Sequence, residues 1–125
     1  MKRIKIFISS VQSEFAQERE MLCQYIRTDA LLGKFFEPFI FEDVPANEYP
    51  ANHVYLREVE WCDIYLGLFG NLYGYEDIEG VSPTEREYDL AATLHKSRLI
   101  YIKAINENER HPKETALIRK VEQDI

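Results

Sequence analysis

The sequence has little that would mark a membrane-spanning, secreted or metal-binding protein. No apolar run approaches the roughly 20 residues that a membrane-spanning helix needs. The short apolar stretch near the N-terminus is followed by no small-residue cleavage site. The two cysteines, Cys23 and Cys62, are far apart and have no metal-type spacing, and the three histidines are scattered. We therefore expect a reduced, cytoplasmic setting with no membrane partner and no bound metal.

Two motifs of common nucleotide chemistry are also missing. No G-x-G-x-x-G follows the first predicted strand, and no Walker-type Gly-Lys-Ser/Thr occurs in the chain. These absences argue against dehydrogenase-type dinucleotide binding and against phosphate-loop ATP hydrolysis. The 15 basic residues are outnumbered by 22 acidic ones, which gives a formal net charge of −7. This charge disfavours non-specific binding of nucleic acid by the chain itself, because neutralising phosphates requires a basic face.

What is present suits a single globular domain. The 125 residues are 46% hydrophobic and 30% charged, which fits a folded chain with one core. Strand-like and helix-like segments alternate. The predicted strands cover residues 3–9, 36–41, 63–69 and 98–104, and the predicted helices cover residues 13–28, 52–61, 82–96 and 111–124. Pro38 indicates a position at the sheet edge or an irregular start for the second strand, and Gly33 is expected to end the region of the first helix.

This order predicts an α/β fold. We expect a flavodoxin-like three-layer sandwich, with helices on both faces of a mainly parallel sheet of four to five strands. Residues 1–125 are interpreted as one domain. Four strands are few for this class, and the last predicted helix carries no stop signal, so we expect the chain to be a piece of a longer protein.

Ligands of open α/β sheets bind beyond the carboxyl ends of the strands. Ser9 and Ser10 follow the first predicted strand, where hydroxyl and backbone N–H groups at a helix N-terminus suit phosphate or carboxylate. The alternative is that Ser10 is a plain helix cap. Gly70 opens a glycine- and tyrosine-rich loop after the third predicted strand, and Tyr73 and Tyr75 in this loop offer faces for a base or a nicotinamide ring. The alternative is that these tyrosines pack the loop against the domain.

The third loop leads into the helix predicted from Ser82. Ser82 at the cap, Pro83 at the first helical position and Glu85 three residues after Ser82 form a capping box. In that motif Glu85 reaches back to the Ser82 N–H, and the hydroxyl of Ser82 remains a candidate ligand-binding group.

Glu87 has no such capping role. It shares a helical face with Leu90, Ala91 and Leu94, so its carboxyl is expected to point toward the sheet near the ligand-binding end. Burial raises the pKa of such a carboxyl, while the helix N-terminus lowers it. This combination suits a catalytic or ribose-binding acid. The alternative is a structural glutamate that is hydrogen-bonded to backbone, to Arg19 or to Arg57.

Several segments taken together resemble a known family. They are residues 6–10, Glu18 with Arg19, and residues 58–67, 70–74 and 82–88. In this order they resemble a bacterial family of domains of unknown function, which is similar to Toll/interleukin-1-receptor (TIR) domains and nucleoside deoxyribosyltransferases. The resemblance implies a TIR-like fold at the N-terminus of larger proteins, ahead of a Schlafen/AlbA-type DNA-binding region. Such proteins are labelled transcriptional regulators or ATP-dependent DNA helicase-related proteins.

The resemblance also implies a site. Deoxyribosyltransferases and NAD-cleaving TIR domains use a glutamate near the start of the helix after the third strand, and in the transferases an alanine follows four residues later. Glu87 and Ala91 match this spacing, whereas Asp89 stands where the transferases usually have glycine. The aromatic-cysteine pair that precedes the glutamate in many TIR domains is absent.

Two functions follow as hypotheses. One is a nucleotide-sensing or self-association module of a larger bacterial regulatory or DNA-processing protein, which reaches nucleic acid only through a downstream domain. The other is an N-glycosidase or transferase that acts on NAD or a nucleotide through Glu87, with Glu42 and Asp43 as weak candidates for a second carboxylate. No resident cofactor is expected, and NAD or a nucleotide enters as ligand.

Overall fold

Four parallel strands form the sheet at the centre of the fold. The computed structural model describes residues 2–43, 55–104 and 107–124. The strands are β1 (Ile4–Ser10), β2 (Phe36–Phe39), β3 (Ile64–Phe69) and β4 (Ser97–Ile102), arranged in the order β2-β1-β3-β4. Every neighbouring pair is parallel. The chain therefore has the α/β architecture that the alternating pattern predicts, and it is consistent with a flavodoxin-like sandwich.

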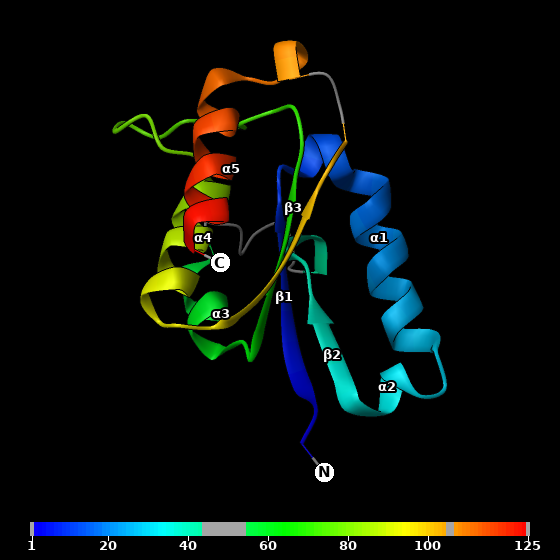
Figure 1. The fold of residues 1–125 in the computed structure, drawn as a ribbon. Helices are drawn as coiled ribbons and strands as arrows, with labels where there is room; N and C mark the ends of the chain where they lie inside the picture. The colour runs from blue at the N-terminus through cyan, green and yellow to red at the C-terminus, as the bar shows by residue number, and fades with distance from the viewer. Residues whose placement is uncertain (1, 44–54, 105–106, 125) are drawn as a thin grey trace.

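Helices flank both faces of this sheet. Figure 1 shows α1 on one face and α3, α4 and α5 on the other. The helices are α1 (Gln12–Thr28), α2 (Leu32–Phe35), α3 (Leu56–Trp61), α4 (Pro83–Thr93) and α5 (Pro112–Asp124), with short 3-10 turns at Phe41–Asp43 and Glu107–Glu109. No helix of the described segments is long and apolar enough to cross a membrane.

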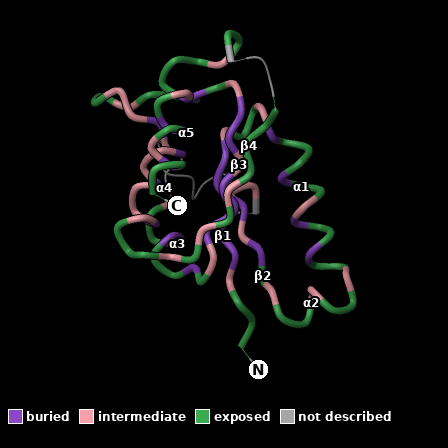
Figure 2. Tube along the Cα trace, in the orientation of Figure 1, coloured by how far each residue is buried: buried purple, intermediate pink, exposed green. Residues whose placement is uncertain are grey.

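The alternation of side chains along β1 and β3 divides the core into two layers. Ile6, Ile8 and Leu66 pack toward α1, where they meet Cys23 and Ile26. On the other face the buried cluster draws on the sheet and on α3, α4 and α5, and its members are Phe7, Val59, Cys62, Tyr65, Phe69, Tyr73, Tyr88, Ala91, Leu117, Ile118 and Val121. Figure 2 shows buried residues concentrated along the central strands. Near-continuous burial of β1 explains why its apolar pattern alternates only weakly.

Most predicted boundaries lie close to the observed ones. Pro38 lies in β2 at the sheet edge, as expected for a residue without an N–H. The helix predicted over 82–96 ends early, because His95 adopts a left-handed φ of 54° and Lys96 N–H bonds back to the carbonyl of Ala91. Parts of the loop predicted over 42–51 and of the helix predicted over 52–61 lie outside the described residues.

Two local predictions at the ends of α1 are wrong. Gly33 does not end the first helix, because α1 already stops at Thr28 and Gly33 lies in α2, where an added Cβ would lie 2.6 Å from the carbonyl oxygen of Arg27. Ser10 does not cap α1. It is the last residue of β1, and its hydroxyl accepts a hydrogen bond from Arg19 instead.

The start of α4 is fixed by Ser82, whose buried hydroxyl accepts a hydrogen bond of 3.1 Å from the Glu85 N–H. Ser82→Ala leaves that donor without its partner and should lower the free energy of unfolding by about 1 kcal/mol, as measured by urea denaturation. Ser97→Ala, at an exposed strand start, is the matched control and should be nearly neutral. Equal stability of the two variants would contradict the capping role.

Candidate functional site

A pocket of about 220 Å³ opens beyond the carboxyl ends of the strands. The chain leaves β1 for β2 on one side and reaches β3 and β4 on the other, so the strand order reverses beside β1 and β3. This reversal is where open α/β sheets bind ligands. The lining residues come from the end of β1, the start of α1, the 3-10 turn after β2, the loop after β3 and the start of α4, and they are Ser10, Val11, Gln12, Ser13, Phe41, Gly74, Tyr75, Pro83, Thr84 and Glu87.

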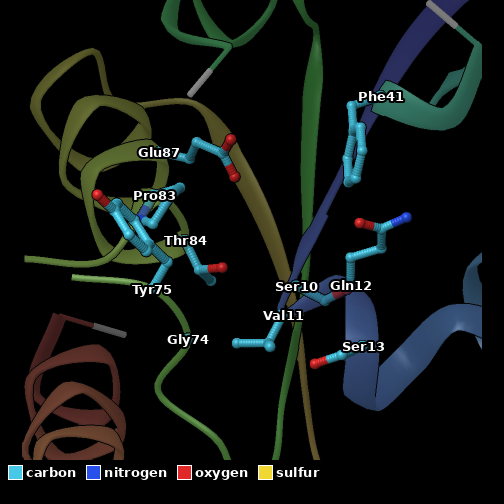
Figure 3. Close-up of a pocket in the computed structure, with 10 residues that line it drawn as sticks. All are labelled: Ser10, Val11, Gln12, Ser13, Phe41, Gly74, Tyr75, Pro83, Thr84 and Glu87. Atoms are coloured by element: carbon cyan, nitrogen blue, oxygen red, sulfur yellow. The ribbon is translucent and has the colours of Figure 1, made fainter. Parts of the chain in front are cut away.

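The pocket has two different sides. Figure 3 shows Glu87, Thr84, Pro83 and Tyr75 on one side, and Phe41, Gln12 and Ser13 on the other. Polar atoms therefore enter the pocket from both sides, while Phe41 and Tyr75 supply aromatic faces. A few polar groups set among apolar and aromatic surface are typical of small-molecule sites.

Glu87 is the buried acid of this pocket. Its Oε1 accepts a hydrogen bond of 2.8 Å from Ser9 Oγ, and its Oε2 lies 3.4 Å from the Tyr55 N–H. Burial raises the pKa of Glu87 to about 7, because the carboxylate loses water; the bonds from Ser9 and Tyr55 and the charge of Arg19 lower the pKa by less. At neutral pH the side chain, which lines the pocket, is therefore divided between acid and carboxylate.

Arg19 is a buried cation next to this acid. Its Nε and Nη2 each lie 2.8 Å from an oxygen of Glu42, and its Nη1 donates to Ser10 Oγ at 2.9 Å. Its guanidinium also lies 5.2 Å from the centre of the Phe41 ring. Burial alone would raise the pKa of Glu42, but the hydrogen bonds and charge of Arg19 outweigh burial and lower it. Glu42 is thus a charged partner of Arg19, and the side chain of Asp43 lies outside what the structure describes.

The loop after β3 is held by carboxylates from two helices. Glu14 of α1 accepts hydrogen bonds from the N–H groups of Asn71 and Leu72 at 2.8 and 2.9 Å. Glu114 of α5 accepts one from the Gly70 N–H at 3.2 Å. A Cβ on Gly70 would lie 2.3 Å from Glu14 Oε2, so this position requires glycine for close approach. Gly70 therefore contacts the carboxylates that hold the loop and does not line the pocket.

Tyr73 also has a defined place inside the domain. Its ring is 3% exposed and stacks on His111 with 5.8 Å between ring centres. Its hydroxyl donates to Glu85 at 2.6 Å and accepts from the Ser82 N–H at 3.1 Å. Glu85 therefore does not reach back to Ser82 as the capping box predicts, because the Tyr73 hydroxyl lies between the two groups. This bridge fixes the loop against the start of α4.

The structure places some of the predicted site residues in the pocket lining and others behind that lining. Ser10 and Glu87 line the pocket, and Gly74 and Tyr75 represent the tyrosine loop there. Ser9 lies behind Glu87 as its hydrogen-bond donor. Gly70, Tyr73 and Ser82 do not line the pocket but support its wall, and their ligand-binding role stays a prediction.

Sequence reasoning missed several groups at this pocket. Phe41 was interpreted only as the end of the second strand, although the carboxyl end of a parallel strand is itself a signal for ligand binding. Thr84 was passed over within the capping box. The Arg19–Glu42 pair had no sequence signal, since its partners lie on α1 and on the turn after β2.

A family model matches almost the entire chain. It covers residues 5–125 and is described as domain of unknown function DUF4062. The chain belongs to the DUF4062 family. No curated protein and no solved structure matches the chain. The match to the DUF4062 model includes the whole sheet except Ile4, the first residue of β1, and all the pocket residues named above.

The described part of this DUF4062 domain contains no group of three or more His, Cys, Asp or Glu side chains placed to hold a metal ion. Its cysteines Cys23 and Cys62 are both buried. Burial raises the pKa of the Cys62 thiol, which keeps it in the protonated, unreactive form. The pocket lining itself offers carboxyl, hydroxyl, amide and aromatic groups.

Two buried carboxyls should make the domain less stable as the pH rises. Burial raises the pKa of Glu87 and of Glu114 to about 7, from an ordinary value of 4.5, and for Glu114 the neighbouring charge of Glu14 adds to the effect. Below pH 4.5 both folded and unfolded chains hold these protons. Between pH 4.5 and pH 7 the unfolded chain ionises while the folded chain keeps these protons, so stability falls over this range and levels off above pH 7, where both states are ionised.

Glu87→Gln removes one of these two titrations. Between pH 5 and pH 8 the variant should lose less stability than the wild type, by on the order of 1–3 kcal/mol in urea unfolding. Glu18→Gln, on the exposed side of α1, is the control and should keep the wild-type pH dependence. A Glu87→Gln profile parallel to that of the wild type would contradict the near-neutral titration of Glu87.

Proposed function

We propose that this domain is a nucleotide-sensing module, with the ligand bound in the Glu87 pocket. The observation that supports this proposal most directly is the buried Glu87 carboxyl, which has a pKa of about 7 and faces an open pocket beside the reversal of strand order. An ionisable group kept from water at this end of a parallel sheet is a common feature of ligand sites.

Each part of the pocket suits one part of a nucleotide. The Glu87 carboxyl can donate to or accept from ribose hydroxyls, depending on its protonation. Phe41 and Tyr75 offer aromatic faces to a base, and Gln12 and Thr84 offer polar groups to its edge or to the sugar. A volume of about 220 Å³ is below the roughly 300 Å³ at which pockets for drug-sized ligands begin, so it suits one nucleoside with its phosphates at the mouth.

The resemblance noted in the sequence supports the wider setting that we propose. Residues 58–67, 70–74 and 82–88 resemble segments of a bacterial family of domains of unknown function, and that family is similar to TIR domains and deoxyribosyltransferases. On this basis we place the domain in the bacterial cytoplasm, at the N-terminus of a larger regulatory or DNA-processing protein with a downstream DNA-binding region. Nucleotide binding or self-association would then be the signal passed to that region. This setting rests on fold-level analogy.

Calorimetry against a panel of nucleoside mono- and diphosphates and NAD tests the binding role. At least one ligand should give saturable heat with the wild type, and Glu87→Gln should weaken its affinity about tenfold, because a hydrogen bond to an ionisable carboxyl is lost. Glu18→Gln should bind like the wild type. No heat from any ligand, together with concentration-dependent assembly in sedimentation, would instead favour a self-association module.

N-glycosidic cleavage is the second candidate, and the titration of Glu87 near neutral pH favours it. The pyridinium ring of NAD is cationic, so its arrival beside Glu87 would favour the carboxylate. A carboxylate oxygen then bonds to the anomeric carbon, or stabilises its developing positive charge, as the bond to the pyridinium nitrogen breaks. The bonding electrons leave with neutral nicotinamide. Water hydrolyses the resulting glycosyl ester, and a proton is released.

Release of nicotinamide from NAD measures this activity. Glu87→Gln should reduce release at least a hundredfold, because an amide cannot supply the negative charge. Ser9→Ala should cause a smaller loss and move the pH profile, since Ser9 donates a hydrogen bond to the Glu87 carboxyl. Glu18→Gln is again the control. Release that is unaffected by Glu87→Gln would remove this residue from the mechanism.

A further inference from the structure

A second surface lies at the opposite end of the sheet from the Glu87 pocket. Trp61, the only tryptophan of the chain, ends α3 beside the amino ends of the strands, and its side chain is 56% exposed. Large aromatic residues are usually more buried than this. A binding partner that covers the Trp61 ring would explain this exposure.

Basic side chains surround this ring. The Arg57 guanidinium lies 5.0 Å from the ring centre and the Lys5 ammonium lies 6.0 Å from it. Lys2 and Arg3 join Lys5 and Trp61 in lining a hollow of about 280 Å³. We call these five residues the Trp61 patch: Lys2, Arg3, Lys5, Arg57 and Trp61.

The cations of the Trp61 patch form no ion pair with their acidic neighbours. Within the described ranges, none of the four lies in a salt bridge with a carboxylate. Asp63 lines the same hollow, but its carboxylate accepts from the backbone N–H of Lys5 at 2.8 Å. Glu37 and Glu58 line a second hollow beside Trp61, together with Lys5 and Arg27. Lys2 and Arg3 line only the first of these two hollows, so the positive charge of the patch is concentrated on the side of the N-terminal segment.

We propose that the Trp61 patch binds single-stranded nucleic acid. One base would stack on the Trp61 ring, and neighbouring phosphates would contact Lys2, Arg3, Lys5 and Arg57. Aromatic stacking combined with cations that follow the backbone is how proteins hold single strands without reading their sequence. A duplex does not fit this patch, because its bases are already stacked on one another.

The net charge of −7 does not prevent this contact. Charges are screened beyond roughly 8–10 Å at physiological salt, so a strand on the patch interacts mainly with the nearby cations. The net charge of the whole chain disfavours nucleic acid, but it does not describe the local charge at the Trp61 patch. The proposal is independent of the Glu87 pocket, since the two sites lie at opposite ends of the parallel strands.

The fluorescence of Trp61 provides a direct test, because no other tryptophan contributes to the signal. A 12-nucleotide oligodeoxythymidylate should quench the emission saturably in 50 mM salt. With four phosphate contacts, affinity should fall about 50-fold between 50 and 200 mM salt, since each contact contributes about −0.7 to the logarithmic slope for a single strand. The same sequence in a duplex should bind at least tenfold more weakly.

A matched pair of double variants distinguishes binding at the Trp61 patch from a general effect of the protein's positive charges. Lys2→Ser with Arg3→Ser should weaken binding and reduce the salt slope by about 1.4, while Trp61 remains as the probe. Lys103→Ser with Arg119→Ser removes the same charge from a hollow beside β4 and α5 and should leave binding unchanged. Equal effects of the two double variants would overturn the assignment to this patch.

Two further ligands test the chemistry of the partner. Inorganic polyphosphate that competes as well as the oligonucleotide would overturn the stacking role of Trp61, because it carries charge without bases. Phosphatidylserine vesicles that shift the emission to the blue, with no quenching by the oligonucleotide, would overturn nucleic acid in favour of a membrane surface. Absence of any response to the oligonucleotide would overturn the proposal outright.

Discussion

The hydrogen bond from Ser9 Oγ to Glu87 Oε1, 2.8 Å long and buried, joins the end of the central strand β1 to helix α4. The two residues are 78 positions apart in the chain, and their contact sets the side of the pocket from which the carboxyl points. Burial is also what raises the pKa of Glu87 to about 7. If α4 packed elsewhere, Glu87 would regain water and behave as an ordinary surface carboxylate, and the pocket would lose its ionisable group.

Other carboxylates in the same region serve the architecture. Glu14 and Glu114 hold the backbone N–H groups of the loop after β3, and Glu85 holds the hydroxyl of Tyr73. These contacts replace the backbone hydrogen bonds that a loop of irregular structure lacks. They also bring acidic groups close together, which contributes to the raised pKa of Glu114. The wall of the pocket is therefore rigid for reasons that involve no ligand.

The two candidate sites lie at opposite ends of the sheet and offer different side chains. At the carboxyl end, Glu87 faces the pocket while Arg19 is paired with Glu42. At the amino end, the Trp61 patch carries cations without a described acid partner beside an exposed aromatic ring. A parallel sheet makes this separation simple, because all amino ends lie on one side and all carboxyl ends on the other. One domain of the DUF4062 family can thus present two chemically different surfaces without interference.

The sequence by itself determined the order of strands and helices along the chain and the edge position of the strand with Pro38. It also determined the cap at Ser82 and the inward face of Glu87. Each of these features depends on the periodicity or chemistry of neighbouring residues. Only the tertiary structure decided that Tyr73 bridges Ser82 and Glu85, that Gly70 makes room for Glu14, and that Arg19 pairs with Glu42. It also decided that Phe41 faces Glu87 across the pocket. These contacts join residues from separate elements, and a carboxylate or a ring has many equivalent partners until packing brings particular ones within reach.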